Sequence, residues 1–198
     1  MRIVAITAGT SVPSSSRMLG ERLGEATIAA LASSGVPAEL THIELRTLAV
    51  DLANHLATRV PGARLREAFD AVCAADGVVA VTPVLNGSYS GLFKLFFDAL
   101  DEGAMTARPV LLGATGGTAR HSLVVEHAML PLFHYLKAAP ATTGVFAATE
   151  DWGDAEASLG RRVRAAGEEF AELVVSRPAL DYADEFASVP DFEVLLRG

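Results

Sequence analysis

The chain has 198 residues, a length that one domain can fold around a sizeable buried core. Hydrophobic residues make up 51% and charged residues 20%, which is typical of folded globular proteins and excludes a disordered chain. The formal net charge of −8, with no stretch rich in Lys or Arg, argues against nucleic acid as a partner.

The N-terminus, MRIVAITAGTS, has one Arg and six apolar residues, too few for the hydrophobic region of a signal peptide. Longer uncharged stretches are interrupted by Pro, Asn and Gly, so we expect no membrane span and a cytoplasmic protein. A single cysteine, Cys73, excludes an internal disulfide and a cysteine-based zinc site. Cys73 shares helical spacing with Leu65, Phe69 and Val72, which predicts a small hydrophobic side chain in the core.

Five short apolar runs predict five strands. Four of them are almost continuously hydrophobic, which is typical of strands buried on both faces of a parallel sheet. The second, ELTHIEL, alternates instead and indicates an edge strand. The predicted strands are residues 3–8, 39–45, 78–82, 110–114 and 142–148.

Amphipathic segments after the strands predict five helices. They are residues 16–33, 63–75, 90–102, 120–137 and 155–175. Strand followed by helix five times predicts a three-layer α/β sandwich. Right-handed crossovers permit few strand orders, and 2-1-3-4-5 is the simplest that places the alternating second strand at an edge. The segment 46–62 is either a long connection or a short extra helix.

Beyond residue 177 the composition changes. Residues 179–196 contain five acidic side chains and no basic ones, with Tyr182, Phe186 and Phe192 between them. Two interpretations stay open: a solvated tail, or an arm whose aromatic side chains pack on a neighbouring subunit. We therefore expect a folded domain over residues 1–177 and an acidic tail or arm over 178–198.

In an open parallel sheet, ligands bind at the carboxyl ends of the strands, near the point where the strand order reverses. The loops after the first, third and fourth strands should therefore form one crevice. The first of these loops places five hydroxyl groups directly before a helix whose free N–H groups favour an anion. They belong to Thr10, Ser11, Ser14, Ser15 and Ser16. This pattern indicates a phosphate cradle; the alternative is an ordinary turn in which one serine caps the helix.

The loop after the third strand is TPVLNGSYSG, residues 82–91. Pro83 stiffens the chain, and Gly87 and Gly91 are expected to allow turns that a Cβ would oppose. GSYSG resembles the nucleophile elbow of serine hydrolases, but Tyr89 stands in place of the nucleophile, so that activity is not supported. The loop after the fourth strand, ATGGTARH, is expected to bring backbone N–H groups close to the edge of a heteroaromatic ring.

On these loops the sequence resembles the NADPH-dependent FMN reductases, a flavodoxin-like family. Within that family it is most similar to the components that supply reduced flavin to a separate flavin-dependent monooxygenase. The motifs are AGTSVPSSSR, TPVLNGSYSGLFKLFFDAL and ATGGTARHSLVVEHAMLPLFHYLKAAP. Together with the order of elements, the resemblance extends from about residue 2 to residue 175.

The resemblance implies a role for each loop. The FMN phosphate would be surrounded by Thr10, Ser11, Ser14, Ser15, Ser16 and Arg17. The flavin ring and ribityl chain would lie along Pro83, Val84, Leu85, Asn86 and Gly87. The isoalloxazine would be bordered from the other side by Thr115, Gly116, Gly117 and Thr118. This sequence departs from many relatives at Leu85, where they carry an aromatic residue, so weaker stacking is expected there.

His127 stands where monooxygenase-partnered relatives often carry an inserted Tyr or His within a π-helical bulge. Pro131, four residues later, removes a backbone donor and clashes with the carbonyl of residue 127, so disruption of the helix is expected on physical grounds. The resemblance implies that such a bulge accompanies loosely held, transferable flavin.

The expected reaction is hydride transfer from NADPH or NADH to FMN, in which the protein supplies position and electrostatics, so no catalytic dyad is required. The N–H groups of Gly116 and Gly117 would stabilise charge on the reduced ring. His121 and His127 are candidates for contact with substrate or flavin, against a packing or subunit-contact role. Candidates for binding the nucleotide phosphates are Arg17, Arg108 and Arg120.

A metal site is not expected, because the five histidines form no i, i+4 pair. Trp152 either covers the crevice or lies in an exposed turn. Two rival functions stay open: an enzyme of the same fold that retains FMN and reduces quinones, azo compounds or metal oxyanions, and a non-enzymatic flavodoxin-like electron carrier. The resemblance further implies a homodimer or homotetramer.

Overall fold

The computed structural model describes residues 1–153 and 156–177, so the predicted acidic tail, 178–198, lies outside the described residues. Its five main strands run parallel in the order β2-β1-β3-β5-β7. Their bounds are β1 Arg2–Thr7, β2 Glu39–Glu44, β3 Gly77–Leu85, β5 Pro109–Gly116 and β7 Val145–Ala148. The predicted order is confirmed, and the alternating strand β2 lies at an edge.

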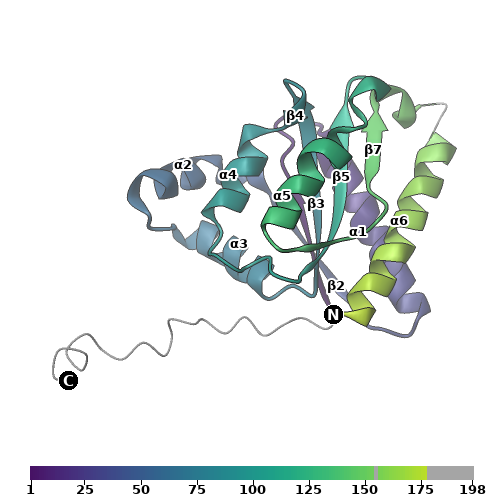
Figure 1. Ribbon diagram of the computed structural model, residues 1–198, viewed down its shortest axis with the longest axis horizontal. Coiled ribbons are helices and arrows are strands. Elements are labelled where there is room, and N and C mark those ends of the chain that lie inside the picture. Colours follow the sequence, from purple (N-terminus) through teal and green to yellow (C-terminus); the bar gives the residue numbers. More distant parts are fainter. Residues whose placement is uncertain (154–155, 178–198) are drawn as a thin grey trace.

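Helices cover both faces of the sheet, which confirms the three-layer sandwich (Figure 1). On one face α1 (Ser15–Ser33) and α6 (Glu156–Ser176) pack side by side. The opposite face carries α2 (Ala49–Thr58), α3 (Ala63–Cys73), α4 (Gly91–Ala99) and α5 (Leu130–Tyr135). The core on this second side is rich in aromatic rings, and Phe93, Phe97 and Phe133 contact one another at centroid distances of 4.8 to 6.1 Å.

The predicted strand 142–148 is shorter than expected, because the edge strand is interrupted. A two-residue strand, β6 (Ala139–Pro140), pairs with the start of β5, and β7 pairs with its end. Between them, the N–H groups of Thr142 and Thr143 donate to Glu169 Oε1, at 2.6 and 3.1 Å, instead of joining the sheet. The apolar run in the sequence could not show that a helix carboxylate satisfies these donors.

The predicted helix 120–137 is divided into three parts. A 3₁₀ turn (Ala119–His121) is followed by a π-helical segment (Val125–Met129), and only then does α5 begin. The N–H of Leu130 donates to the carbonyl of Val125, five residues back, as in a π-helix. Pro131 cannot donate to the carbonyl of residue 127, so the predicted disruption of the helix is confirmed.

Other boundaries differ by a few residues. The segment 46–62 contains a short helix, α2, preceded by a 3₁₀ turn. Helix α4 ends at Ala99, three residues before the predicted end. Cys73 is the last residue of α3 and lies at the edge of the core, half-buried, rather than inside it; burial raises the pKa of its thiol. Among the described helices, none combines the length and apolar character needed to cross a bilayer.

Candidate functional site

The carboxyl ends of β1, β3 and β5 lie at one edge of the sheet, the upper edge in Figure 1. The register places Thr7 of β1 beside Val81 of β3, and Pro83 of β3 beside Thr115 of β5. The three loops singled out in the sequence therefore leave the sheet from neighbouring positions. This edge includes the point where the strand order reverses, between β1 and β3.

A buried hydrogen bond connects two of the three loops. Ser16 Oγ, in the first turn of α1, lies 2.7 Å from Thr115 Oγ1 at the end of β5. Both side chains are almost inaccessible to solvent, at 2% and 5% exposure. Residues 99 positions apart in the chain thus meet at the edge predicted to bind a ligand.

The hydroxyl-rich loop after β1 divides its side chains between two roles. Ser14 is the N-cap of α1, because its Oγ accepts the N–H of Arg17 at 3.2 Å, and Ser16 is committed to Thr115. Thr10, Ser11 and Ser15 are exposed. Three hydroxyl groups therefore face outward around a helix N-terminus, whose first N–H groups have no partner within the helix.

Arg17 makes two ion pairs beside this loop. Its guanidinium lies 2.8 Å from Glu21 and 2.9 Å from Glu44, and the hydrogen bond to Glu21 and the charges of both carboxylates raise the pKa of Arg17. Arg46 Nε contacts the other carboxylate oxygen of Glu44 at 3.0 Å. These side chains, with Ser11 and others, line a cavity of about 270 Å³.

Glu44 and Arg46 were not predicted as site residues. Glu44 is the last residue of β2, at the same carboxyl edge of the sheet as the three loops, and Arg46 follows two residues later. Their position at the carboxyl end of the predicted strand 39–45 was the signal that could have identified them.

After β3 the chain turns back on itself as a tight hairpin. Strand β4 (Ser88–Tyr89) pairs antiparallel with the end of β3, and the turn residues Asn86 and Gly87 have φ of +51° and +83°. Positive φ at both positions is typical of an Asn-Gly hairpin turn. The hairpin presents Leu85, 50% exposed, and Asn86 to solvent, while Pro83 and Val84 are half-buried.

The prediction that Gly91 is needed for its conformation is wrong. A Cβ at Gly91 would meet open space, and its φ is not in the left-handed region. Gly91 is instead the first residue of α4, whose N-cap Ser90 accepts the N–H of Phe93. The N–H of Ser90 in turn donates to Thr82 Oγ1 at 3.0 Å, which fixes the hairpin between strand and helix.

The loop after β5 contains two glycines in different surroundings. A Cβ at Gly116 would lie 2.9 Å from the ring of Phe146, so the backbone packs closely there. A Cβ at Gly117 would meet nothing within 4 Å, and Gly117 and Thr118 are exposed. Arg120 and His121 follow, with Arg120 Nε 3.3 Å from His121 Nε2. His127 is exposed in the π-helical segment.

The structure removes Arg108 from the candidate site. Arg108 immediately precedes β5, at the opposite edge of the sheet, and is 6% exposed. Its guanidinium donates to the backbone carbonyls of Ala104 and Cys73, at 3.0 and 2.8 Å, and of Ala75. Burial lowers its pKa. Arg108 therefore holds the start of β5, and its position before the predicted strand 110–114 was the signal that it lies at the amino end of the strand, away from the crevice.

Trp152 fits neither predicted position. It is half-buried in a 3₁₀ turn (Thr149–Trp152), and its ring lies 5.1 Å from the guanidinium carbon of Arg22 on α1. Nearby, Asp151 accepts the N–H of Ala148 and pairs with Arg162 of α6. These contacts hold Trp152 and the end of β7 against α1 and α6. Trp152 therefore does not lie over the crevice.

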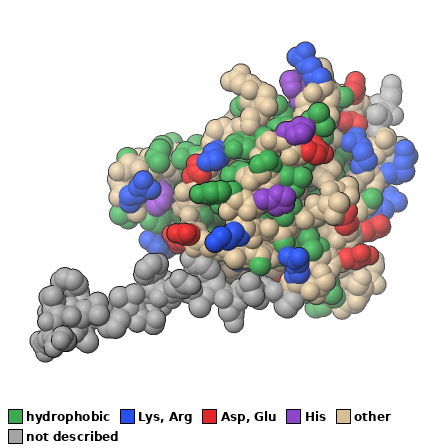
Figure 2. Space-filling view, in the orientation of Figure 1, with side chains coloured by type: hydrophobic (Ala, Val, Ile, Leu, Met, Phe, Trp, Pro, Cys, Tyr) green, Lys and Arg blue, Asp and Glu red, His purple; other side chains and the backbone are tan. Residues whose placement is uncertain are grey.

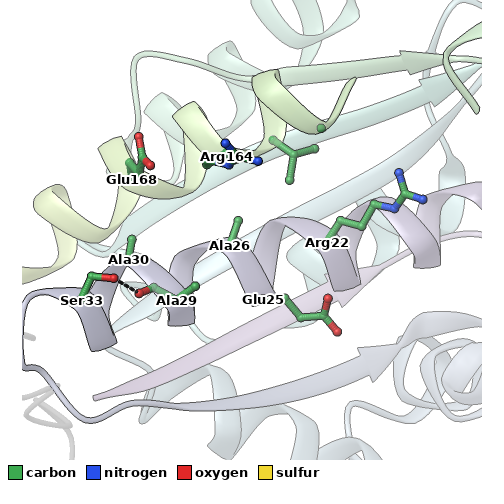
Figure 3. A pocket seen from close by; sticks show the side chains of 10 residues that line it. Arg22, Glu25, Ala26, Ala29, Ala30, Ser33, Arg164 and Glu168 are labelled. Atoms are coloured by element: carbon green, nitrogen blue, oxygen red, sulfur yellow. Dashed lines mark hydrogen bonds between the residues drawn. The ribbon is translucent and has the colours of Figure 1, made fainter. Parts of the chain in front are cut away.

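Another cavity lies away from this edge of the sheet, along α1 and α6. About 540 Å³ in volume, it is lined by described side chains of these two helices, which pack against each other beside it. Figure 3 shows Ala26 and Ala30 of α1 pointing toward α6, with Arg164 and Glu168 on the opposite side. This cavity mixes small apolar side chains with charged ones and lies away from the three loops, whereas the crevice gathers hydroxyls, backbone donors and charges.

Comparison with known proteins agrees with this geometry. Residues 1–153 match the family of NADPH-dependent FMN reductases. The chain is 37% identical over 182 residues to an FMN reductase (NADPH) of Pseudomonas aeruginosa, covering 90% of this chain and 95% of that protein. It is also 37% identical over 188 residues to the NADH-dependent FMN reductase SfnE of Pseudomonas putida, covering 91% and 96%.

Solved structures show the same fold. An oxidoreductase from Corynebacterium diphtheriae superposes with a TM-score of 0.85 at 44% identity, covering 88% of this chain and 97% of that one. A WrbA-like flavodoxin from Agrobacterium tumefaciens superposes with a TM-score of 0.61 at 14% identity, covering 89% and 98%, and shares the fold. The three-layer sandwich is therefore flavodoxin-like.

Proposed function

The chain belongs to the NADPH-dependent FMN reductase family and is an oxidoreductase that uses FMN and a reduced nicotinamide nucleotide; from this premise we propose that it binds FMN in the crevice described above and releases the flavin after reduction. The phosphate would lie at the N-terminus of α1, near Thr10, Ser11, Ser15 and the N–H groups of the first helical turn. The ring would lie between Pro83–Asn86 and Thr115–Thr118.

The buried hydrogen bond between Ser16 and Thr115 is the observation that carries this placement. It fixes two loops to each other: the loop after β1, residues 9–17 (the phosphate loop), and the loop after β5, residues 115–118 (the ring loop). One ligand can therefore contact both. Gly117 supports it, because the space around its Cα is open and a flat ring can approach the backbone closely. The exposed hydroxyls of Thr10, Ser11 and Ser15 supply donors for phosphate oxygens.

FMN, when bound, supplies the chemistry by accepting a hydride from the nicotinamide. This chain would supply position and electrostatics. The N–H groups of Gly116 and Gly117 would donate to the edge of the ring, where negative charge develops during reduction. Arg120, exposed beside the same loop, is positioned to pair with a phosphate of the nicotinamide nucleotide, and His121 next to it to contact either ligand.

We further infer that the flavin is passed to a flavin-dependent monooxygenase. The π-helical segment around His127, which follows the loop after β5 and a 3₁₀ turn, supports this inference through the resemblance already stated. The hold on the flavin would also be weakened at Leu85, whose aliphatic side chain stacks less well on a ring than an aromatic one.

FMN titration of the purified protein tests the proposal. We expect flavin fluorescence to change on binding, NADPH or NADH to be oxidised when FMN is added, and the bound flavin to be lost on gel filtration. Initial rates should show sequential kinetics with FMN as a substrate. Ping-pong kinetics with retained FMN would favour a prosthetic-flavin reductase, and binding without nucleotide oxidation would favour an electron carrier.

A further inference from the structure

Glu44 stands between two arginines at the ligand-binding edge. One carboxylate oxygen lies 2.9 Å from Arg17 Nη1 and the other lies 3.0 Å from Arg46 Nε. The backbone carbonyl of Glu44 accepts Thr47 Oγ1 at 2.9 Å, so the end of β2 is fixed. With its side chain 23% exposed, Glu44 is the most enclosed member of this ion-pair network.

The network borders the predicted phosphate site directly. Arg17 lies in the first turn of α1, and the cavity of about 270 Å³ is lined by Arg17, Arg46 and Glu44 together with Ser11 and Ser14 of the phosphate loop. Glu21 also lines the cavity and pairs with Arg17. Two guanidinium groups are thus near the place where a phosphate would bind, but two carboxylates compensate their charge.

We propose that Glu44 limits the affinity of this site for the phosphate of FMN, by keeping Arg17 and Arg46 paired with itself; the inference rests on the proposed function. A phosphate at the α1 N-terminus competes with Glu44 for the same guanidinium donors. Binding therefore depends mainly on hydroxyl and backbone N–H donors. This weak hold on the phosphate suits a flavin that leaves after reduction.

Glu44→Gln removes the competing charge and keeps the shape of the side chain. We expect the dissociation constant for FMN to fall about 3- to 10-fold, the range for releasing partly exposed ion pairs. Riboflavin, which lacks the phosphate, should bind the variant and the wild type equally. The gain for FMN should shrink as salt is added, because added ions screen the freed charges.

Glu25→Gln is the matched control. It removes the same charge, but Glu25 lies on α1 at the α1–α6 cavity, away from the phosphate site. Glu21→Gln, which frees Arg17 from its other partner, is a second test and should give a smaller gain for FMN. Adding Arg17→Gln to Glu44→Gln should remove most of the gain. Far-UV circular dichroism and the unfolding midpoint establish that each variant is folded.

Two results would overturn the proposal. One is unchanged or weaker FMN binding by folded Glu44→Gln while the wild type binds FMN; the other is equal tightening for FMN and riboflavin. Failure of the wild type to bind FMN or oxidise the nicotinamide nucleotide would instead reject the proposed function together with this inference.

Discussion

Two adjacent glycines in the loop after β5 are needed for different reasons, one for packing and the other for ligand binding. Gly116 cannot carry a side chain without displacing the ring of Phe146, so its substitution would disturb packing. Gly117 has open space around it, and a side chain there would occupy only the region assigned to the flavin ring. A substitution at Gly117 therefore reports on the ligand and leaves the protein core unaffected.

We predict that Gly117→Val lowers FMN affinity and turnover together, at least 10-fold, because a branched side chain excludes the ring from the backbone donors at a cost of about 1.4 kcal/mol or more. Fluorescence titration and nucleotide oxidation measure the two effects. Gly160→Val, in open space on α6, is the matched control. Unchanged flavin binding by Gly117→Val would contradict the placement of the ring.

Glu169 illustrates a different role for a charged residue. Desolvation alone would raise the pKa of its carboxyl, but hydrogen bonds from Thr143 and Thr142 outweigh it and the net pKa is lowered. A carboxyl with a depressed folded-state pKa stabilises the fold above its unfolded pKa, and this stabilisation is lost as pH falls through the folded pKa.

We therefore predict that Glu169→Gln lowers the free energy of unfolding at neutral pH, and that the difference from wild type narrows below about pH 4. Urea unfolding at several pH values measures it. Glu172→Gln, exposed on the same helix, should show little difference at any pH. A Glu169→Gln effect independent of pH would mean that the charge contributes nothing.

At the scale of elements, the pairing of α1 with α6 depends on small residues. A Cβ at Gly167 would lie 2.7 Å from Ala26 Cβ and 2.9 Å from the carbonyl carbon of Ala26, which is backbone and cannot rotate away. At Gly160, two turns earlier in α6, a Cβ would meet open space. The two glycines thus have opposite expected responses to the same substitution.

Gly167→Ala should destabilise the protein by about 1–3 kcal/mol, the usual cost of overpacking. Gly160→Ala should be neutral or stabilise by up to about 1 kcal/mol, because alanine favours a helix over glycine. Chemical denaturation of both variants measures the difference. Equal effects at the two positions would show that α1 and α6 are not in close backbone contact.

At the scale of the whole molecule, one face exposes apolar side chains that a monomer leaves in water. Tyr135 is 85% exposed and Leu123 is 59% exposed, in and before α5. Figure 2 shows hydrophobic and histidine side chains interspersed on the face that carries α4 and α5. An exposed apolar surface of this kind is typical of a protein interface.

We predict a homodimer or homotetramer, with a mass two or four times the 20.7 kDa of the chain. Light scattering after gel filtration measures it. Leu123→Glu with Tyr135→Glu should lower the mass, because burying two carboxylates in an interface is costly. Val50→Glu, at an apolar side chain on α2 that is 73% exposed, is the control. A wild-type mass of one chain would contradict the prediction.

The sequence by itself determined the order of elements, the parallel sheet with β2 at its edge, and the break in the helix before Pro131. These features follow from hydrophobic periodicity and from the missing N–H of proline, which act within a few residues. The three loops of the crevice were also predicted from the sequence. Each is identified by its own residues, and the carboxyl ends of parallel strands lie at one edge of the sheet.

Only the tertiary structure decided which side chains meet. It paired Ser16 with Thr115, placed Glu44 between Arg17 and Arg46, and joined the guanidinium of Arg108 to the carbonyls of Ala104 and Cys73. The physical reason is that hydrogen bonds and ion pairs between distant segments depend on how helices and strands pack. Hydrophobic periodicity reports only on neighbouring residues, so it cannot identify such partners.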